Sequence, residues 1–144
     1  MAYADTSFLC SLYLHDANTA AATRHVIRQK PALALTAWQR CELRNAVRLS
    51  VARGNVTALA AEQALADIDA DTAAGDLVAT DLIWSEVFAK AEELSAAHTT
   101  RLANRTLDIV HVAAALTVGT RIFLTCDARQ FALAKAAGLQ PVSL

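Results

Sequence analysis

The sequence predicts an α/β fold in which a parallel sheet is covered by helices on both faces. Short apolar segments alternate with longer helical ones, and most lack the polar alternation of a half-exposed strand. No linker-like composition divides the 144 residues. A domain of about 150 residues buries roughly 70% of the surface that its unfolded chain exposes, so stability needs neither metal nor disulfide. We expect a single domain over residues 1–144.

Turn and capping residues set the elements of the first half. A short buried strand over 1–5 precedes Thr6 and Ser7, and a helix then begins with apolar residues at helical spacing. A second helix over 17–29 ends ahead of Pro31, and 32–36 is an apolar strand. The helix over 37–53 ends at Gly54, and the next, over 57–73, closes at Gly75.

The second half continues the alternation. After a strand over 77–80 comes an amphipathic helix over 82–97, and then a largely apolar helix over 106–118 that ends at Gly119. Residues 121–126 form the clearest strand of the chain because they favour β-structure and are apolar. Asp127 opens a helix that runs to Gly138, and 139–142 is a last edge strand.

Composition argues against a membrane or secreted protein. The longest stretch without Asp, Glu, Lys or Arg runs over 109–120, well short of the roughly 20 apolar residues that cross a bilayer. The N-terminus has an acid at Asp5 and no basic flank before an apolar stretch, so it does not resemble a secretory signal. We expect a cytoplasmic protein.

The cysteines do not predict a zinc site. Cys10, Cys41 and Cys126 lie far apart, form no CxxC pair and have apolar sequence neighbours. We expect them to be buried, reduced and packed as small hydrophobic residues.

Charge is distributed unevenly along the chain. Residues 62–93 hold nine acids and one base, a net −8, whereas the rest of the chain holds twelve bases and five acids, a net +7. A basic surface attracts polyanions by neutralising phosphates and releasing counterions. Arg40, Arg44 and Arg48 recur every four residues and form one ridge on a helix, and Arg101 and Arg105 form a second pair. The bases predict RNA binding through Arg40, Arg44, Arg48 and Arg105; the alternative is a solvated helix face.

Two acids stand at the carboxyl ends of predicted strands. Asp5 and Asp127 each end a strand and open a helix. Open parallel sheets bind ligands beyond this edge, and neighbouring strands would bring the two carboxylates into one site. Either residue is also a favoured helix N-cap.

Two further acids lie within apolar helices. Glu42 shares its helix face with Trp38, Asn45 and Leu49, although a surface ion pair is an alternative. Asp108 is followed by a long apolar run, so we expect it to be largely buried. A buried ionised carboxylate costs several kcal/mol unless it is paired or bound to metal, and the ordinary partners would be Arg105 or His111.

Several polar residues accompany these acids. Thr125 shares a strand face with Asp127 and could support the cluster, while Cys126 points to the opposite face. Thr6 and Ser7 could hydrogen-bond to Asp5 or to a metal-bound water. His111 could be a base or ligand, but a lone His on an apolar helix is more often hydrogen-bonded core.

The acids together predict a divalent metal. Crowded carboxylates repel one another and raise each other's pKa, which a cation relieves. All-oxygen sites that retain water favour Mg²⁺ or Mn²⁺, and such ions polarise a phosphate and activate a water. The residues predict a metal-dependent phosphodiesterase.

The sequence resembles the PIN-domain ribonucleases, and among them the VapC-type toxins of toxin–antitoxin pairs. The resemblance spans the whole chain and depends on the order and spacing of four motifs: Tyr3-Ala4-Asp5-Thr6-Ser7, Cys41-Glu42-Leu43, Leu107-Asp108-Ile109-Val110-His111 and Leu124-Thr125-Cys126-Asp127, the last followed by Phe131.

The resemblance implies both a fold and an activity. It implies a three-layer α/β/α sandwich whose five-stranded parallel sheet has the order 3-2-1-4-5. It also implies that Mg²⁺ or Mn²⁺ is held by the catalytic carboxylates Asp5, Glu42, Asp108 and Asp127, with Thr125 in support. Proteins of this kind are similar in being small dimers that cleave RNA and are silenced by a separately encoded VapB-type antitoxin.

Two other functions stay open at the level of the sequence. An aspartyl-nucleophile phosphatase commonly needs a second Asp two residues after the first, where this chain has Ser7. In a non-catalytic module, the acids would be helix caps and the basic face would bind RNA or a partner protein.

Overall fold

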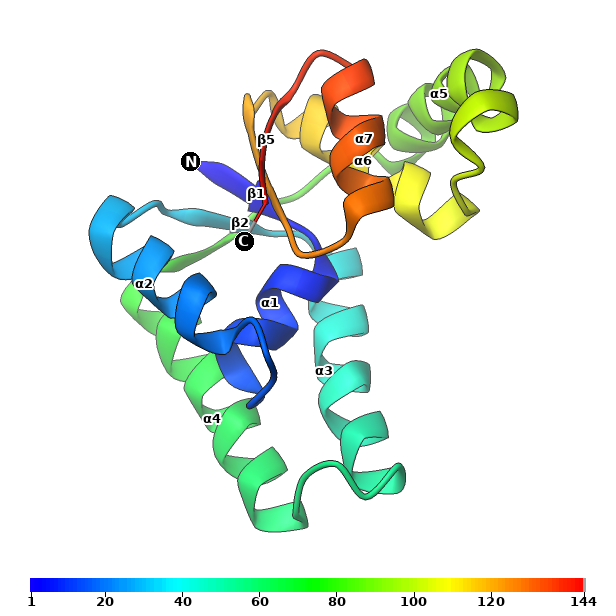
Figure 1. Cartoon of the computed structure of the whole chain (residues 1–144). Helices are drawn as coiled ribbons and strands as arrows, with labels where there is room; N and C mark the ends of the chain where they lie inside the picture. Colours follow the sequence, from blue (N-terminus) through cyan, green and yellow to red (C-terminus); the bar gives the residue numbers. More distant parts are fainter. Residues whose placement is uncertain (144) are drawn as a thin grey trace.

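The computed structural model describes residues 1–143 (Figure 1). Strands and helices alternate along most of the chain, as the apolar segments predict. Their order is β1 (Ala2–Ala4), α1 (Thr6–Tyr13), α2 (Thr19–Gln29), β2 (Leu33–Leu35), α3 (Ala37–Ala52), α4 (Ala58–Ala74), β3 (Leu77–Ala79), α5 (Trp84–Leu102), α6 (Thr106–Val118), β4 (Ile122–Thr125), α7 (Ala128–Ala136) and β5 (Gln140–Ser143).

The strands form one five-stranded sheet in the order β3-β2-β1-β4-β5. All four pairings are parallel. Tyr3 is in register with Ala34 of β2 and with Phe123 of β4, so β1 lies at the centre. The predicted α/β class and the strand order are therefore confirmed.

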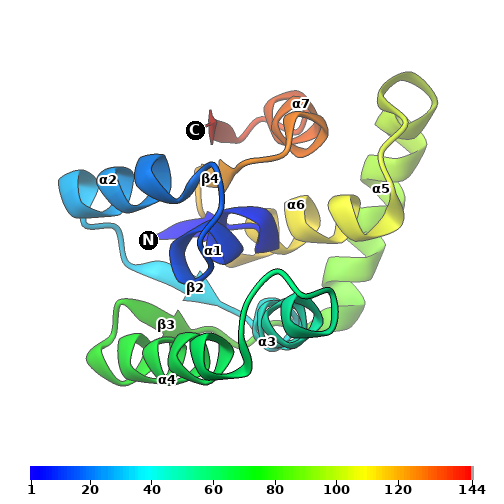
Figure 2. The same cartoon turned by 60° about the horizontal axis from the view of Figure 1, so that its bottom comes forward.

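The sheet separates two hydrophobic cores. Tyr3 and Phe123 point to the face covered by α5, α6 and α7, whereas Ala2, Ala4 and Leu124 point to the face covered by α1, α2, α3 and α4. Figures 1 and 2 show these two groups of helices on opposite sides of the strands. Both faces of the central strands are buried, which explains their continuous apolar sequence.

Most predicted boundaries lie within two residues of the observed ones. The exception is α5, which continues to Leu102 instead of ending at 97 because its cap is Ala103 in the left-handed conformation, with φ of 51°. A non-glycine residue in that conformation gives no compositional signal. Helix α6 has the predicted bounds and ends at Gly119, with φ of 77°.

The expected burial of the cysteines is wrong. Cys41 is exposed, and Cys10 and Cys126 are only half-buried. Apolar sequence neighbours did not predict this because Cys41 lies on the arginine-bearing face of α3, opposite the residues that pack on the sheet. Burial, together with nearby carboxylates, raises the pKa of the Cys10 thiol to about 12.

No helix within residues 1–143 combines the length and the apolar character that crossing a membrane requires.

Candidate active site

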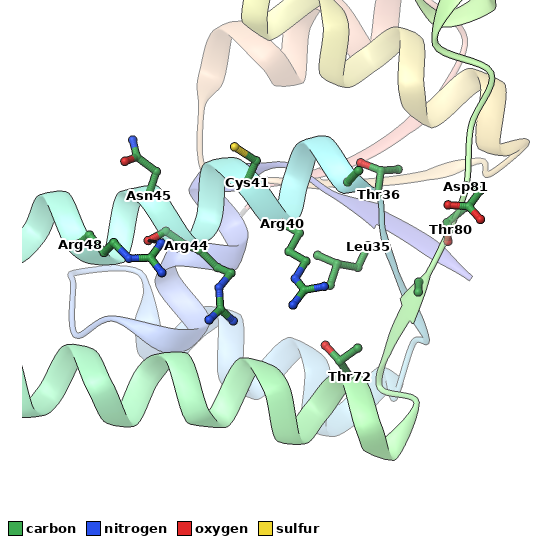
Figure 3. A pocket seen from close by; sticks show the side chains of 12 residues that line it. Leu35, Thr36, Arg40, Cys41, Arg44, Asn45, Arg48, Thr72, Thr80 and Asp81 are labelled. Carbon is green, nitrogen blue, oxygen red and sulfur yellow. Dashed lines mark hydrogen bonds between the residues drawn. The ribbon is translucent and has the colours of Figure 1, made fainter.

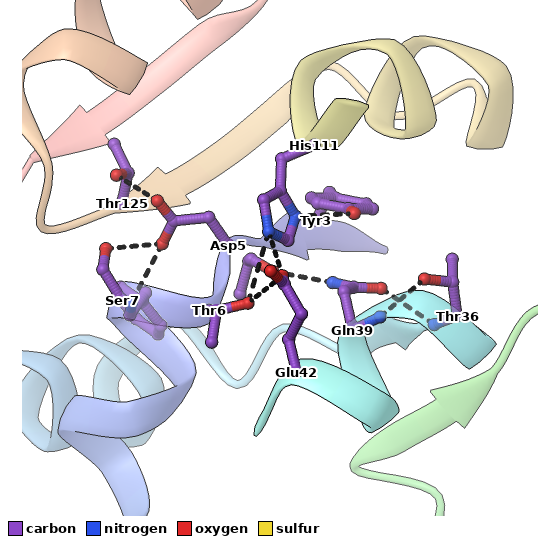
Figure 4. Close-up of polar contacts among 11 residues, drawn as sticks. Tyr3, Asp5, Thr6, Ser7, Thr36, Gln39, Glu42, His111 and Thr125 are labelled. Atoms are coloured by element: carbon purple, nitrogen blue, oxygen red, sulfur yellow. Dashed lines mark hydrogen bonds and ion pairs between the residues drawn. The ribbon is translucent and has the colours of Figure 1, made fainter. Parts of the chain in front are cut away.

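A cavity of about 270 Å³ lies at the carboxyl edge of the sheet. Its walls come from α1, α3, α6, α7 and the residue that precedes α7, which are segments far apart in the sequence. It is lined by Thr6, Ser7, Glu42, Arg105, Leu107, Asp108, His111, Asp127 and Gln130. Three of the four predicted carboxylates therefore reach one cavity, and Figure 4 shows the polar contacts around Glu42 and Asp5.

Asp5 is completely buried and does not line this cavity, but it accepts from Ser7, which does. It caps α1 by accepting from the Phe8 amide at 2.9 Å, and it accepts from Ser7 Oγ at 2.7 Å and Thr125 Oγ1 at 2.6 Å. Because β1 and β4 are neighbours, Thr125 reaches Asp5 as a support, as predicted. Burial raises the pKa of Asp5, and these three donors only partly oppose that rise.

Glu42 projects from α3 toward His111. His111 Nε2 lies 2.6 Å from Glu42 Oε2, and Thr6 Oγ1 donates to the same oxygen at 2.7 Å. Burial alone would raise the pKa of Glu42, but the hydrogen bonds from His111 and Thr6 and the nearby imidazole hold it below its usual range. Thr6 thus contacts Glu42, not Asp5 as the sequence suggested, because the first turn of α1 directs Ser7 to Asp5 and Thr6 outward.

Helix α3 is held in place by a buried amide. Gln39 Nε2 donates to the Ala4 carbonyl at 2.6 Å, and Gln39 Oε1 accepts from the Thr36 amide at 2.8 Å. The Thr36 hydroxyl in return accepts from the Gln39 amide at 3.2 Å, which completes a capping box. These bonds tie the start of α3 to the end of β1 and set the position of Glu42 relative to Asp5.

Asp108 is buried, and its partner is one of those expected from the sequence. Its Oδ2 accepts from the Arg105 amide at 3.2 Å and from Arg105 Nε at 3.3 Å. The Arg105 side chain is 69% exposed and that of Asp108 only 6%. Most of the Arg105 side chain therefore remains free to meet a ligand at the cavity mouth.

Asp127 caps the N-terminus of α7. Its Oδ1 accepts from the amides of Arg129 and Gln130 at 2.7 and 3.2 Å. Asp127 therefore both caps a helix and lines the cavity. The other carboxylate oxygen, Oδ2, accepts no hydrogen bond from residues 1–143.

Sequence patterns favoured a structural role for His111 and did not single out Gln130. His111 is 3% exposed and contacts Tyr3, Thr6 and Glu42. Gln130 lines the cavity, and its Oε1 is buried without a partner in the described part of the chain. The partners of His111, Glu42 and Tyr3, lie 69 or more residues away in the sequence. The residues next to His111 therefore could not indicate these hydrogen bonds.

The donor atoms suit a hard divalent cation in kind but are not gathered as a finished metal site. Carboxylate oxygens at one cavity are the ligands that Mg²⁺ and Mn²⁺ prefer. Over residues 1–143, however, no three His, Cys, Asp or Glu side chains lie close enough together to hold an ion. Each acid instead accepts hydrogen bonds from protein groups. Asp108 Oδ2 already accepts from Arg105, whereas Asp127 Oδ2 has no donor within residues 1–143 and would be available to an ion.

The arginine ridge faces a different cavity. Arg40, Arg44 and Arg48 line a space of about 600 Å³ between α3, α4 and β3 (Figure 3). Arg44 Nη1 contacts Asp69 Oδ1 of α4 at 2.8 Å, and Arg40 lies 4.0 Å from the same oxygen. The ridge is therefore not brought to the carboxylate cavity, because Glu42 projects from another face of α3. Among the four predicted RNA-binding arginines, Arg105 lines that cavity.

Comparison with known proteins supports the fold alone. No family profile matches the sequence, and no curated protein matches it. Among solved structures, the chain is similar to the crystal structure of PAE2754 from Pyrobaculum aerophilum, with a TM-score of 0.62 and 19% sequence identity. The similarity covers 99% of this chain and 90% of that one. The chain is thus an α/β protein with this overall architecture.

Proposed function

We propose that this chain is a Mg²⁺- or Mn²⁺-dependent endoribonuclease of the PIN-domain type that acts as the toxin of a toxin–antitoxin pair. One observation carries the proposal. Glu42, Asp108 and Asp127, which come from three separate segments, line one small cavity, and the buried Asp5 accepts a hydrogen bond from Ser7 in its wall. Carboxylate oxygens that line one cavity suit a site that receives a hard divalent cation.

The residues of the cavity suggest how the chemistry is divided. Glu42, Asp108 and Asp127 would hold the ion, and Asp5 would complete the negative field. When bound, such an ion polarises a phosphate, lowers the pKa of an attacking water and neutralises the leaving oxygen. The exposed guanidinium of Arg105 is placed to bind a phosphate oxygen of the RNA at the cavity mouth.

The direct test is cleavage of end-labelled RNA with and without the ion. The purified protein is incubated with mixed single-stranded RNA in Mg²⁺, in Mn²⁺ and in EDTA. We expect fragments only with an ion. Asp108→Asn should lose cleavage, whereas Asp67→Asn, which changes an exposed acid of α4, should retain it.

Two outcomes would contradict the proposal. Equal cleavage in EDTA would exclude a metal-dependent reaction, and equal cleavage by Asp108→Asn would identify a contaminating nuclease. Retention of full activity by Asp67→Asn is the control for the preparation.

One observation favours a second candidate, a non-catalytic module that binds RNA or protein. Asp5, Glu42, Asp108 and Asp127 all have ordinary hydrogen-bond partners as helix caps or ion pairs. This candidate predicts RNA binding without fragments and no measurable Mn²⁺ binding in titration calorimetry. The phosphatase alternative is weaker because Ser7 donates to Asp5 at the position where a second carboxylate would stand.

The toxin role and its partners are part of the same proposal. We infer a homodimer and a separately encoded VapB-type antitoxin that covers the carboxylate cavity. Induced expression should arrest cell growth, and Asp108→Asn should abolish the arrest. Co-expression of a short neighbouring gene with a DNA-binding segment should restore growth and co-purify with the chain. Arrest by the Asp108→Asn variant would show that toxicity does not depend on the carboxylates.

A further inference from the structure

We propose that Tyr3 and His111 are positioning residues that hold Glu42 with one carboxylate oxygen fixed and the other directed to a ligand. The inference rests on the proposed function, since it concerns how the same cavity is prepared for its ion. It adds two residues, from β1 and α6, that do not themselves contribute carboxylates.

A chain of hydrogen bonds connects the three side chains (Figure 4). The Tyr3 hydroxyl lies 3.0 Å from His111 Nδ1, and His111 Nε2 lies 2.6 Å from Glu42 Oε2. Tyr3 is completely buried and His111 is 3% exposed, whereas the Glu42 side chain is 22% exposed. The chain therefore runs from the core to the wall of the cavity.

The chemistry of the two ends determines the direction of these bonds. A carboxylate only accepts hydrogen bonds, so the hydrogen in the 2.6 Å contact between His111 Nε2 and Glu42 Oε2 belongs to His111. In a neutral imidazole the other nitrogen then accepts, and the Tyr3 hydroxyl donates to it. Tyr3 thus selects the tautomer of His111 that serves Glu42.

The surrounding rings restrict the movement of His111. Tyr3 and Trp38 both meet the imidazole edge-on, with ring centroids 5.9 and 6.3 Å away. Tyr3 is in turn stacked on Phe123, at 5.7 Å between centroids. A ring packed in this way presents Nε2 to Glu42 in one direction.

Both hydrogen bonds to Glu42 fall on the same oxygen. His111 and Thr6 donate to Oε2, and within residues 1–143 no group donates to Oε1. The arrangement resembles the outer hydrogen bonds that orient ligands in metal sites, whose loss typically weakens metal binding by about 10- to 100-fold. Oε1 is then the oxygen that would be available to bind an ion.

The sharpest variant is Tyr3→Phe, because it removes one hydroxyl and keeps the stacked ring. Tyr13→Phe is the matched control, since its hydroxyl donates to Asp71 at 2.6 Å, away from the cavity. Nitrogen-15 spectra of the imidazole report the tautomer directly and do not depend on activity. We expect His111 to be protonated at Nε2 alone in the parent and in Tyr13→Phe, and to populate both tautomers in Tyr3→Phe.

The second measurement is Mn²⁺ affinity by calorimetry. We expect Tyr3→Phe to bind Mn²⁺ about tenfold more weakly and Tyr13→Phe to bind as the parent does. His111→Gln keeps a donor near the Nε2 position and should retain most of the affinity, whereas His111→Leu should lose it. In cleavage assays the Tyr3→Phe defect should appear as a higher Mn²⁺ requirement and be reversed at saturating ion.

The inference would be overturned by a parent His111 that is protonated at Nδ1 alone or at both nitrogens, or by equal Mn²⁺ affinities in Tyr3→Phe and Tyr13→Phe. If His111→Leu does not fold, Tyr3→Phe and His111→Gln still decide the question. Failure of the parent to bind Mn²⁺ would overturn the proposed function and, with it, the ligand role of Glu42. The tautomer measurement would still show whether Tyr3 fixes His111.

Discussion

Asp5 and Glu42 belong to the same candidate site but meet opposite electrostatic environments. Asp5 has no exposed surface, and burial outweighs its three donors, so the pKa of Asp5 is raised. Glu42 is partly exposed, and His111 outweighs the effect of burial, so the pKa of Glu42 is lowered. The difference comes from the neighbours that the fold supplies and not from the side chains themselves.

The two carboxylates should therefore affect stability with opposite dependence on pH. A raised pKa in the fold means that folding favours the protonated form, so the parent loses stability as pH rises from the usual carboxyl pKa, about 3.9, to the raised value of Asp5. In EDTA, Asp5→Asn should gain stability relative to the parent across this window, by about 1.4 kcal/mol per pKa unit of the shift. Urea denaturation between pH 3.5 and 7 measures the difference.

Glu42→Gln is the control, because its effect on stability should change with pH in the opposite direction. A lowered pKa stabilises the fold above the usual carboxyl pKa, and this stability is lost as pH falls through the lowered value. Glu42→Gln should therefore be less stable than the parent near neutral pH and approach it in acid. A stability difference between Asp5→Asn and the parent that does not change with pH would contradict the electrostatic account of Asp5.

Asp108→Asn should separate catalysis from folding. Its ion pair involves a guanidinium that is 69% exposed, and such pairs contribute little to stability. Asn can still accept from the Arg105 amide through its carbonyl oxygen. We expect RNA cleavage to fall by at least about 100-fold, while the melting temperature in EDTA stays equal to that of the parent or rises. A clearly lower melting temperature would identify Asp108 as a structural member of the ion pair.

At the level of elements, α3 presents two functional faces. Gln39 and Glu42 connect it to β1 and to the cavity, whereas the arginine ridge faces α4. Asp69 of α4 already neutralises part of this ridge. The positive charge that predicted RNA binding is thus divided between the ridge on α3, part of which pairs with Asp69, and Arg105, an exposed side chain just before α6 that pairs with Asp108.

RNA binding should consequently depend more on Arg105 than on Arg44. Arg105→Gln should weaken the binding of single-stranded RNA and lower the slope of log K against log salt by about 0.7, the value for one phosphate contact. Arg44→Gln is the matched control and should leave the slope unchanged because Arg44 is held by Asp69. Filter binding in EDTA, where we expect no cleavage, measures both slopes. Equal slope changes would assign the ridge an RNA-binding role as well.

On the scale of the whole molecule, two large cores stabilise the fold without the site. The residues that bury most surface lie on the two faces of the sheet and do not include the four carboxylates. Removal of metal should therefore leave the fold intact and change only the occupancy of the cavity.

Metal removal and addition should be visible in thermal melts. We expect protein purified in metal-free buffer to have the same melting temperature with and without EDTA. Mn²⁺ at 100 times its Kd should stabilise the fold by about 2.7 kcal/mol, because the ion binds the folded state alone. The same addition should leave the melting temperature of Asp108→Asn nearly unchanged. An equal Mn²⁺ response in parent and variant would place the ion elsewhere on the surface.

The family resemblance and the strand pattern predicted where several of the site residues lie. Asp5 and Asp127 end strands and open helices, and this local pattern placed them at the carboxyl edge of a parallel sheet. The partner of Asp108 was also among those expected, because Arg105 lies one helical turn away. The roles of Thr6, His111 and Gln130 were not accessible, since each depends on which side chain another element brings within about 3 Å.

The sequence by itself determined the class of the fold, the order of its elements and the edge at which the acids collect. Apolar periodicity and turn residues act locally, and local patterns can be read from the chain alone. Only the tertiary structure decided that the arginine ridge faces α4, that Cys41 is exposed and that Tyr3, His111 and Glu42 form one hydrogen-bonded chain. These features depend on the rotation of each helix about its axis, which is set by packing between segments far apart in the sequence.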